Sequence, residues 1–447
     1  MSDRASHATS AVPAPQAAER WIPLALGLCV LLPLIVFVRQ WKGFFWFGDD
    51  WDLLWQIDEI ALWPWVLKPW AESFSPLFKT VWGSSVFIFG GSYFAFIIML
   101  WLANAATVAV MARLLRQAGF SWGSIAPAVL ILGTSATTIE TMSWSVQLSP
   151  LLANLFFCIA VLLFWNGPVQ NPRWTLATHL PAILAALASA LCYSRGILTG
   201  FILALMAFWP FVPQRSAGFR QRCLTAVGFV APGFLVVFVV LTMAGGNQRS
   251  ILQTDFETFA RMVEYGAWYF FVNPFHALLH MDSMGPRTTL TLGALKVALI
   301  VFAFRKTTPD VRWLLLVMLL YDLANSAVLG LGRYHTGLGT VASSRYQHCA
   351  MTSYIPFFAI LFQRLGSTIR ATANKRIWAT TSIALLVLVL QLSLWPAALR
   401  NYVAYRGQQT REAFLNSPHP PAGYRVPGIP FMPVEKAEEL VRDYNLH

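Results

Sequence analysis

"WIPLALGLCVLLPLIVFVRQWKGFFWFGDDWDLLWQIDE", residues Trp21 to Glu59, joins an uncharged apolar run to a cluster of acids. The first part, Trp21 to Val38, has about the length that crosses a bilayer as an α-helix. The second part sets carboxylates among aromatic side chains directly after that run. The pattern predicts a membrane span followed by an acidic loop at the membrane surface. The acids are Asp49, Asp50, Asp52, Asp58 and Glu59.

The rest of the chain repeats the apolar pattern. Of its 447 residues, 57% are hydrophobic and only 12% are charged, about half the charged fraction of a soluble protein. The composition predicts an all-α polytopic membrane protein with about eleven transmembrane helices and no soluble domain of comparable size. The expected spans are 21–38, 93–112, 122–139, 148–166, 175–193, 196–213, 223–243, 288–304, 311–331, 349–363 and 377–397.

Basic residues fall in short clusters at alternate turns between these spans. The positive-inside rule then predicts a cytoplasmic N-terminus and, with an odd number of spans, an extracytoplasmic C-terminus. The chain divides into a disordered cytoplasmic leader (1–20), a transmembrane unit (21–397) and an extracytoplasmic tail (398–447). The same clusters account for the net charge of +12, so we expect membrane lipids rather than nucleic acid as the partner of these charges.

Two of the predicted outer loops are long, 39–92 and 244–287. The first is rich in tryptophan, whose ring favours the headgroup level of a membrane. We therefore expect it to form short helices along the outer surface, with its acids within reach of a lipid headgroup.

Several segments of the chain resemble the GT-C superfamily of membrane glycosyltransferases, in its protein O-mannosyltransferase-like and arabinosyltransferase-like branches. "GFFWFGDDW", 43–51, is similar to the acidic motif of the family's first outer loop. "TSATTIETMSWSVQLSPLLANLFF", 134–157, is similar to a later segment of the family and puts Glu140 and Trp144 on its Glu and Trp positions. Three further segments are similar to the family, and all five occur along the chain in the family's order. The three are "SPLFKTVWGSSVFIFGG" (75–91), "SALCYSRGILTGF" (189–201) and "SSRYQHCAMTSYIPFF" (343–358).

The resemblance covers about residues 21–365 and implies a GT-C-like catalytic domain over 21–397. It also implies an enzyme that takes a sugar from a polyprenyl-phosphate carrier. The acceptor would be a surface glycan, a lipid or an exported protein such as a pilin. The enzyme would be a multi-pass protein of a bacterial inner membrane with its active site on the periplasmic face.

Such a transfer needs a base, and Asp49 is the first candidate with Asp50 close behind. Apolar surroundings raise a carboxylate pKa, which suits the group to accept a proton near neutral pH. The alternative is a solvated turn without a catalytic role.

Transfer also needs a cation for the departing phosphate, and arginine binds phosphate oxygens in a forked geometry. Arg345 is the first candidate, followed by Arg195 and Arg333, and the alternative for each is ordinary headgroup anchoring. Glu140 is a candidate for orienting the acceptor or holding a cation, unless it is a helix-end carboxylate in a hydrogen bond.

A divalent metal ion is an alternative that the residues do not demand. His276 and His280 share a helix face at their spacing, with Asp282 nearby. An interfacial helix explains the same pattern without a metal.

Lys296 and Asp322 lie inside two consecutive spans at matching depth. An isolated charge within a bilayer is expensive, so the sequence predicts an ion pair between them.

Two other functions fit a chain of this kind. A flippase or transporter of lipid-linked glycans would need a polar path through the bilayer, whereas the polar residues here collect at one face. An O-antigen-ligase-like transferase would rely on a large late outer loop, whereas here the early loop is the rich one.

Overall fold

The computed structural model describes residues 21–70, 73–170, 176–209, 217–243, 255–279, 285–305, 307–368, 373–406, 411 and 432–447. Helices are the only extended regular elements within these ranges, apart from an isolated β-bridge between Trp70 and Ser73. The prediction of an all-α membrane protein is confirmed. The expected leader, 1–20, lies outside the described residues.

The helices follow one another with short connections. In chain order they are α1 (Ile22–Cys29), α2 (Leu34–Arg39), α3 (Asp49–Glu59), α4 (Leu62–Leu67), α5 (Pro76–Ile88), α6 (Tyr93–Gln117), α7 (Trp122–Gly133), α8 (Ile139–Ser143), α9 (Leu148–Gln170), α10 (Leu176–Cys192), α11 (Ile197–Met206), α12 (Phe219–Met243), α13 (Phe256–Val272), α14 (Phe275–Leu278), α15 (Pro286–Arg305), α16 (Pro309–Arg333), α17 (Ser344–Thr368), α18 (Ala373–Arg406) and α20 (Val434–Asp443).

Eight helical stretches within the described ranges are long and apolar enough to cross a membrane, fewer than the eleven or so that hydropathy predicts. The difference falls on α10, α11 and α17. α10 has only 17 residues and α11 only 10, while α17 begins with the polar sequence Ser-Arg-Tyr-Gln-His. The eight are Ile22–Arg39, Tyr93–Gln117, Trp122–Ser143, Ser145–Asn166, Phe219–Met243, Pro286–Arg305, Pro309–Thr336 and Ser382–Arg400.

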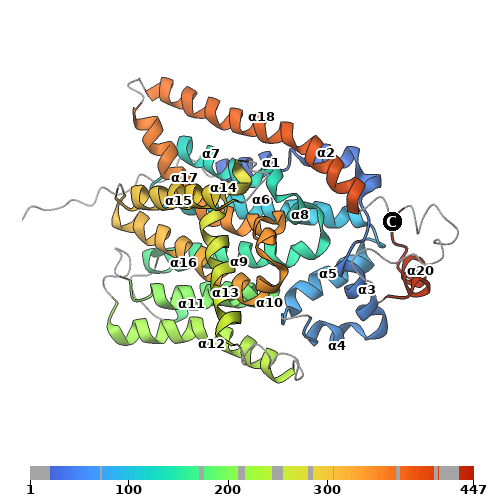
Figure 1. Ribbon diagram of the computed structural model, residues 1–447. Helices are drawn as coiled ribbons and strands as arrows, with labels where there is room; N and C mark the ends of the chain where they lie inside the picture. The colour runs from blue at the N-terminus through green and yellow to red at the C-terminus, as the bar shows by residue number, and fades with distance from the viewer. Residues whose placement is uncertain are drawn as a thin grey trace, which may run out of the picture.

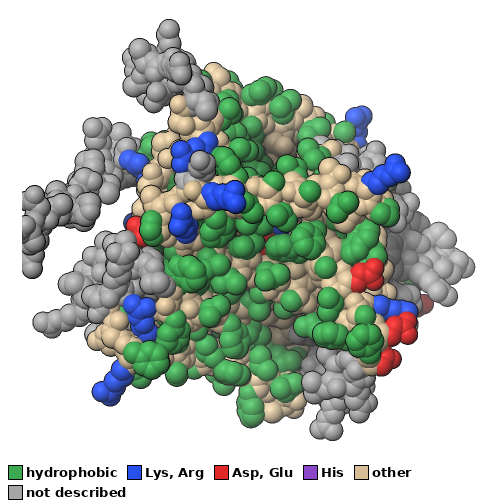
Figure 2. All heavy atoms as spheres, turned by 60° about the vertical axis from the view of Figure 1, so that its left-hand side comes forward, with side chains coloured by type: hydrophobic (Ala, Val, Ile, Leu, Met, Phe, Trp, Pro, Cys, Tyr) green, Lys and Arg blue, Asp and Glu red, His purple; other side chains and the backbone are tan. Residues whose placement is uncertain are grey.

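The outer surface of the helix bundle is apolar. Figure 2 shows hydrophobic side chains across the middle of one face, with most charged side chains toward its two edges. Large exposed side chains line α12, among them Phe234 and Phe238, and α18, among them Leu386 and Leu390. Such a surface is stable only against lipid or another apolar phase, because water would leave these side chains unfavourably hydrated.

Two glycines bring α13 close to α16. A Cβ at Gly330 would lie 2.4 Å from the main-chain oxygen of Met262, and one at Gly266 would lie 3.0 Å from that of Ser326. Small residues permit this close backbone approach between membrane helices. The contact matters for function because both helices carry side chains of the candidate site.

Residues 39–92, the predicted first outer loop, contain the short helices that the sequence predicts. α3, α4 and α5 gather at one end of the bundle together with α20, while α18 runs along its side (Figure 1). Trp46 is completely buried at the centre of this end, with its ring against those of Trp82, Tyr93 and Phe96 at centroid distances of 5.3–5.8 Å. The fully buried tryptophans of this segment therefore build a packed support for α3, whereas Trp41 and Trp63 are exposed.

Candidate functional site

The acidic helix α3 begins directly after a glycine, Gly48, that lies against Trp144. Gly48 has a φ of +56°, and a Cβ there would lie 3.2 Å from the Trp144 ring. Glycine is the residue that adopts this backbone without steric cost. The Trp144 Nε1–H also donates to the main-chain oxygen of Phe47 at 3.1 Å. The short segment before α3 is thus held on the face of Trp144, and Asp49 follows it directly.

The two adjacent acids have opposite environments. Asp49 is exposed, whereas Asp50 is completely buried. Asp50 accepts hydrogen bonds from the Phe47 main-chain N–H at 3.1 Å and from the Ser145 hydroxyl. Ser145 is itself held by the Trp82 Nε1–H at 2.9 Å. Successive residues of a helix point about 100° apart, so one carboxylate faces outward while its neighbour anchors α3 to the bundle.

Both acids have raised pKa values. Burial raises the pKa of Asp50 to about 7, against the opposing effect of its hydrogen bonds from Ser145 and Phe47. The surrounding protein also raises the pKa of Asp49, although part of that side chain reaches the surface. The charges of Arg345 and Arg333 oppose this rise. Asp49 therefore combines access to solvent with an increased affinity for protons.

Arg345 and Arg333 lie at the ends of two successive helices beside Asp49. Arg333 is the last residue of α16 and Arg345 the second of α17. The Arg345 guanidinium lies 6.0 Å from the Trp144 ring centroid and 5.1 Å from that of Tyr346. Its Nε is buried and has no hydrogen-bond partner among the described residues. Aromatic faces hold a cation without neutralising it.

Glu140 fixes the start of α17. Its Oε2 accepts from the Ser344 hydroxyl at 2.9 Å and from the Arg345 main-chain N–H at 3.2 Å. A carboxylate at a helix N-terminus satisfies free N–H groups and favours the positive end of the helix dipole. Glu140 thus lies as a helix-end carboxylate in hydrogen bonds, one of the two interpretations that the sequence left open. Through that contact it places the backbone of Arg345.

Arg195 occupies a deeper position than the other two arginines. It belongs to the short 3₁₀ helix η5 (Ser194–Gly196) and is only 6% exposed. Its Nη1 donates to Asn325 Oδ1 on α16 at 3.0 Å, and its guanidinium lies 5.1 Å from the Tyr193 ring centroid. Arg345 and Arg333 are the arginines whose charges act on Asp49, whereas Arg195 lies in a buried polar network.

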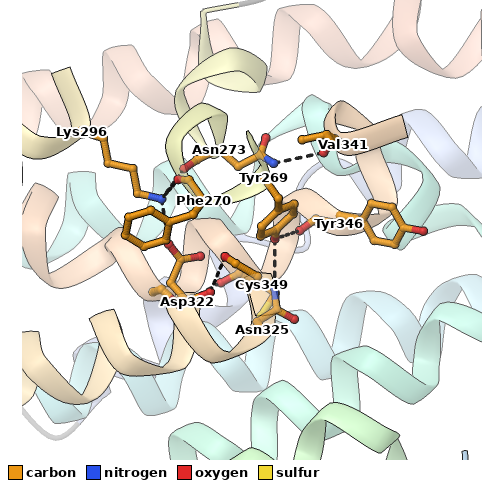
Figure 3. Close-up of polar contacts among 11 residues, drawn as sticks. Tyr269, Phe270, Asn273, Lys296, Asp322, Asn325, Val341, Tyr346 and Cys349 are labelled. Atoms are coloured by element: carbon orange, nitrogen blue, oxygen red, sulfur yellow. Dashed lines mark hydrogen bonds and ion pairs between the residues drawn. The ribbon is translucent and has the colours of Figure 1, made fainter. Parts of the chain in front are cut away.

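The predicted ion pair inside the bundle is confirmed. Lys296 Nζ lies 2.8 Å from Asp322 Oδ2, and both side chains are fully buried (Figure 3). The ammonium group also donates to the main-chain oxygens of Asn273, at 2.8 Å, and Phe270. All three ammonium protons have an acceptor, so the pair closes the end of α13 against α15 and α16. The second carboxylate oxygen, Asp322 Oδ1, is buried and has no hydrogen-bond partner among the described residues.

The possible metal ligands are only partly described. His276 lies in α14, whereas His280 and Asp282 fall outside the described residues. No group of three or more His, Cys, Asp or Glu side chains suited to a metal ion occurs in the described part of the chain. Binding of a divalent ion by His276, His280 and Asp282 therefore stays an alternative prediction to an interfacial helix without a metal.

Sequence reasoning missed several residues of the site. Ser145 and Tyr269 carry no sequence signal, because a serine or tyrosine at the edge of an apolar segment is common. Asn325 could have been found, since it lies within a predicted span one turn after Asp322, and polar residues inside spans are rarely without a role.

The geometry therefore brings together Asp49, Arg345, Arg333 and Trp144 at one end of the bundle. Comparison of the chain with models of protein families, with curated proteins and with solved structures finds no match.

Proposed function

We propose that the protein is an inverting glycosyltransferase of the GT-C type. It would move a sugar from a polyprenyl-phosphate carrier to an extracytoplasmic glycan, lipid or exported protein at a bacterial inner membrane. The observation that carries the proposal is an exposed carboxylate, Asp49, with a raised pKa beside Arg345 and Arg333. A proton acceptor next to cations is what transfer from a phosphate ester to a hydroxyl requires.

In the proposed reaction, Asp49 takes the proton of the acceptor hydroxyl. The acceptor oxygen forms a bond to the anomeric carbon from the side opposite the phosphate, so the configuration inverts. The bond between that carbon and the phosphate oxygen breaks, and its electron pair leaves with the polyprenyl phosphate. Arg345 and Arg333 stabilise the negative charge that grows on the phosphate, because their guanidinium groups stay charged and offer several N–H donors.

Asp50 has a supporting role in this proposal. Its oxygens already accept from Ser145 and Phe47, and it is inaccessible to a substrate. The base is therefore assigned to Asp49 alone, with Asp50 holding α3 in place.

The test measures free polyprenyl phosphate released from the lipid-linked sugars of the host membrane, with envelope fractions supplied as acceptor. This product is the same whatever the sugar or acceptor. Asp49→Asn should reduce release by about 10²–10⁴-fold, because the near-isosteric amide cannot accept the proton. Glu59→Gln, which neutralises an exposed acid at the other end of α3, is the matched control and should retain release.

Two outcomes of this assay would count against the proposal. One is release by correctly folded Asp49→Asn at the rate of the wild type. The other is movement of intact sugar lipid across a vesicle membrane without any release, which would favour a flippase. In the same assay Arg345→Lys should recover only part of the activity lost in Arg345→Ala, because lysine lacks the forked geometry.

A further inference from the structure

The buried arginine of η5 lacks a negative partner. No carboxylate lies within ion-pair distance of Arg195 among the described residues, and its Nε has no hydrogen-bond partner there. Among the described residues, its guanidinium has one hydrogen bond, to an amide oxygen, and one aromatic ring beside it. Burying a charge is costly unless it is paired. The environment of Arg195 therefore favours binding of an anion.

The nearby ion pair on α16 provides a comparison for Arg195. Asp322 lies one helical turn before Asn325, and its Oδ2 pairs with Lys296 Nζ at 2.8 Å. At Asn325 the same helix offers Arg195 a neutral amide oxygen at 3.0 Å. An amide orients the guanidinium and leaves its charge uncompensated, whereas a carboxylate at this position would cancel it.

The orientation of the Asn325 amide is set by a hydroxyl. Tyr269 donates its only hydroxyl proton to the Tyr346 main-chain oxygen at 2.8 Å. That hydroxyl can then only accept, and it does so from Asn325 Nδ2 at 3.1 Å (Figure 3). The amide oxygen is left facing Arg195. Asn325 and Tyr269 are both completely buried, so no water competes for these bonds.

The same chain of hydrogen bonds extends to Tyr346, the residue after Arg345. Tyr346 follows Arg345 in α17, and its ring lies under the Arg345 guanidinium. Arg195, Asn325, Tyr269 and Tyr346 thus form a continuous relay between the buried guanidinium of Arg195 and the backbone beside the half-buried Arg345.

We propose that Asn325 and Tyr269 are positioning residues that hold Arg195, still charged, for the phosphate of the lipid-linked donor. The inference rests on the proposed function, since it adds Arg195 to the donor-phosphate site of Arg345 and Arg333.

Binding of undecaprenyl phosphate to the purified protein in nanodiscs tests this, with uncharged undecaprenol as the reference lipid. Asn325→Asp should keep or raise the thermal unfolding midpoint, because one oxygen of the new carboxylate pairs with Arg195 and the other can accept the hydroxyl proton of Tyr269. It should nevertheless weaken phosphate binding at least tenfold, because the same pair removes the charge. A purely structural role predicts that affinity and stability change together.

A second pair of variants avoids any change of charge. Tyr269→Phe removes the hydroxyl that orients Asn325 and should weaken binding of undecaprenyl phosphate several-fold. Tyr265→Phe is its matched control, since Tyr265 is equally buried on α13 and its hydroxyl contacts Thr340 at 2.9 Å, outside the relay. Tyr265→Phe should bind as the wild type does.

The results separate the two proposals. If Arg345→Ala weakens binding but folded Asn325→Asp and Tyr269→Phe do not, the relay is wrong and the donor site stands. If the wild type binds undecaprenyl phosphate no better than undecaprenol, the proposed function and the relay both fail.

Discussion

At the scale of single residues, the first turn of α3 separates two identical side chains by their environment. Asp49 faces the arginines, while Asp50 is enclosed with the Ser145 hydroxyl and the Phe47 N–H. The adjacent acids are visible in the sequence, but which one is enclosed is not. That depends on the rotation of α3, which Gly48 sets by its contact with Trp144.

The buried acid gives a pH dependence of known sign. Burial raises the pKa of Asp50 from 3.8 to about 7, so between these values the folded chain holds a proton there that the unfolded chain has lost. The contribution of Asp50 to stability is therefore fully present below about pH 4 and is lost as the pH rises toward 7, at up to about 1.4 kcal/mol per pH unit.

Asp50→Asn should remove this dependence, because the amide does not titrate. We expect the unfolding midpoint of the wild type to fall more steeply between pH 4.5 and 7 than that of the variant. Thermal unfolding of both proteins in one detergent measures it. Parallel curves would show that Asp50 is charged in the fold throughout this range.

At the scale of elements, the C-terminal helix α20 is docked on the acidic helix α3. Lys436 Nζ lies 2.6 Å from Asp58 Oδ2, and the Tyr444 hydroxyl donates to the other Asp58 oxygen at 3.3 Å. Leu440 is fully buried in the same contact. This ion pair is still partly open to solvent, which screens it, so we expect the apolar side of α20 to provide most of the docking energy.

Alanine substitutions at two adjacent glycines test this docking. Gly91 and Gly90 both have positive φ values, so alanine costs a similar backbone strain of roughly 1–2 kcal/mol at either position. At Gly91 the new Cβ would also lie 2.2 Å from the Tyr444 main-chain oxygen, whereas at Gly90 nothing lies within 4 Å. Gly91→Ala should therefore displace the C-terminal segment, and Gly90→Ala should not.

Hydrogen exchange of the α20 amides measures the difference. We expect at least tenfold faster exchange in Gly91→Ala than in Gly90→Ala. Equal protection in both variants would mean that the C-terminal segment does not rest on this turn.

At the scale of the whole molecule, hydropathy locates the apolar helices whether they face lipid or protein, but it does not show which side chains pair between them. α12 and α18 expose large apolar side chains and are plain in the sequence. α17 contains the predicted span 349–363, and the polar side chains of Gln347 and His348 near its start are buried against other helices. His348 bonds to Asn104 on α6 at 3.1 Å and to Asn154 on α9 at 3.3 Å. Such partners come from distant parts of the chain, so the sequence alone cannot pair them.

The depth of a charged residue within the membrane is easier to predict from the sequence than the residue with which it pairs. The pairing of Lys296 with Asp322 was predictable because two opposite charges at one depth in neighbouring spans have few alternatives. The partner of Arg195 was not, since its neutral asparagine is one of many polar residues that could have reached it.

The arrangement of the whole bundle also constrains its topology. The Tyr93 main-chain N–H, at the start of α6, donates to the His447 main-chain oxygen at 3.0 Å. The first loop, the start of α6 and the C-terminal helix therefore lie on one side. α6 has 25 residues and is about 37 Å long, enough to bring its other end, Gln117, to the opposite side.

Single cysteines at exposed positions test this topology in a variant whose five native cysteines are replaced. With the basic turns in the cytoplasm, Glu59→Cys and Glu435→Cys should react with a membrane-impermeant maleimide in intact cells. Gln117→Cys should react only after permeabilisation. Labelling of only one of the variants Glu59→Cys and Glu435→Cys in intact cells would contradict the docking of α20 on α3. The reverse pattern, with Gln117 alone labelled from outside, would place Asp49 and its arginines in the cytoplasm. Nucleotide sugars are available on that side, so a polyprenyl-phosphate donor would no longer be favoured over a nucleotide sugar.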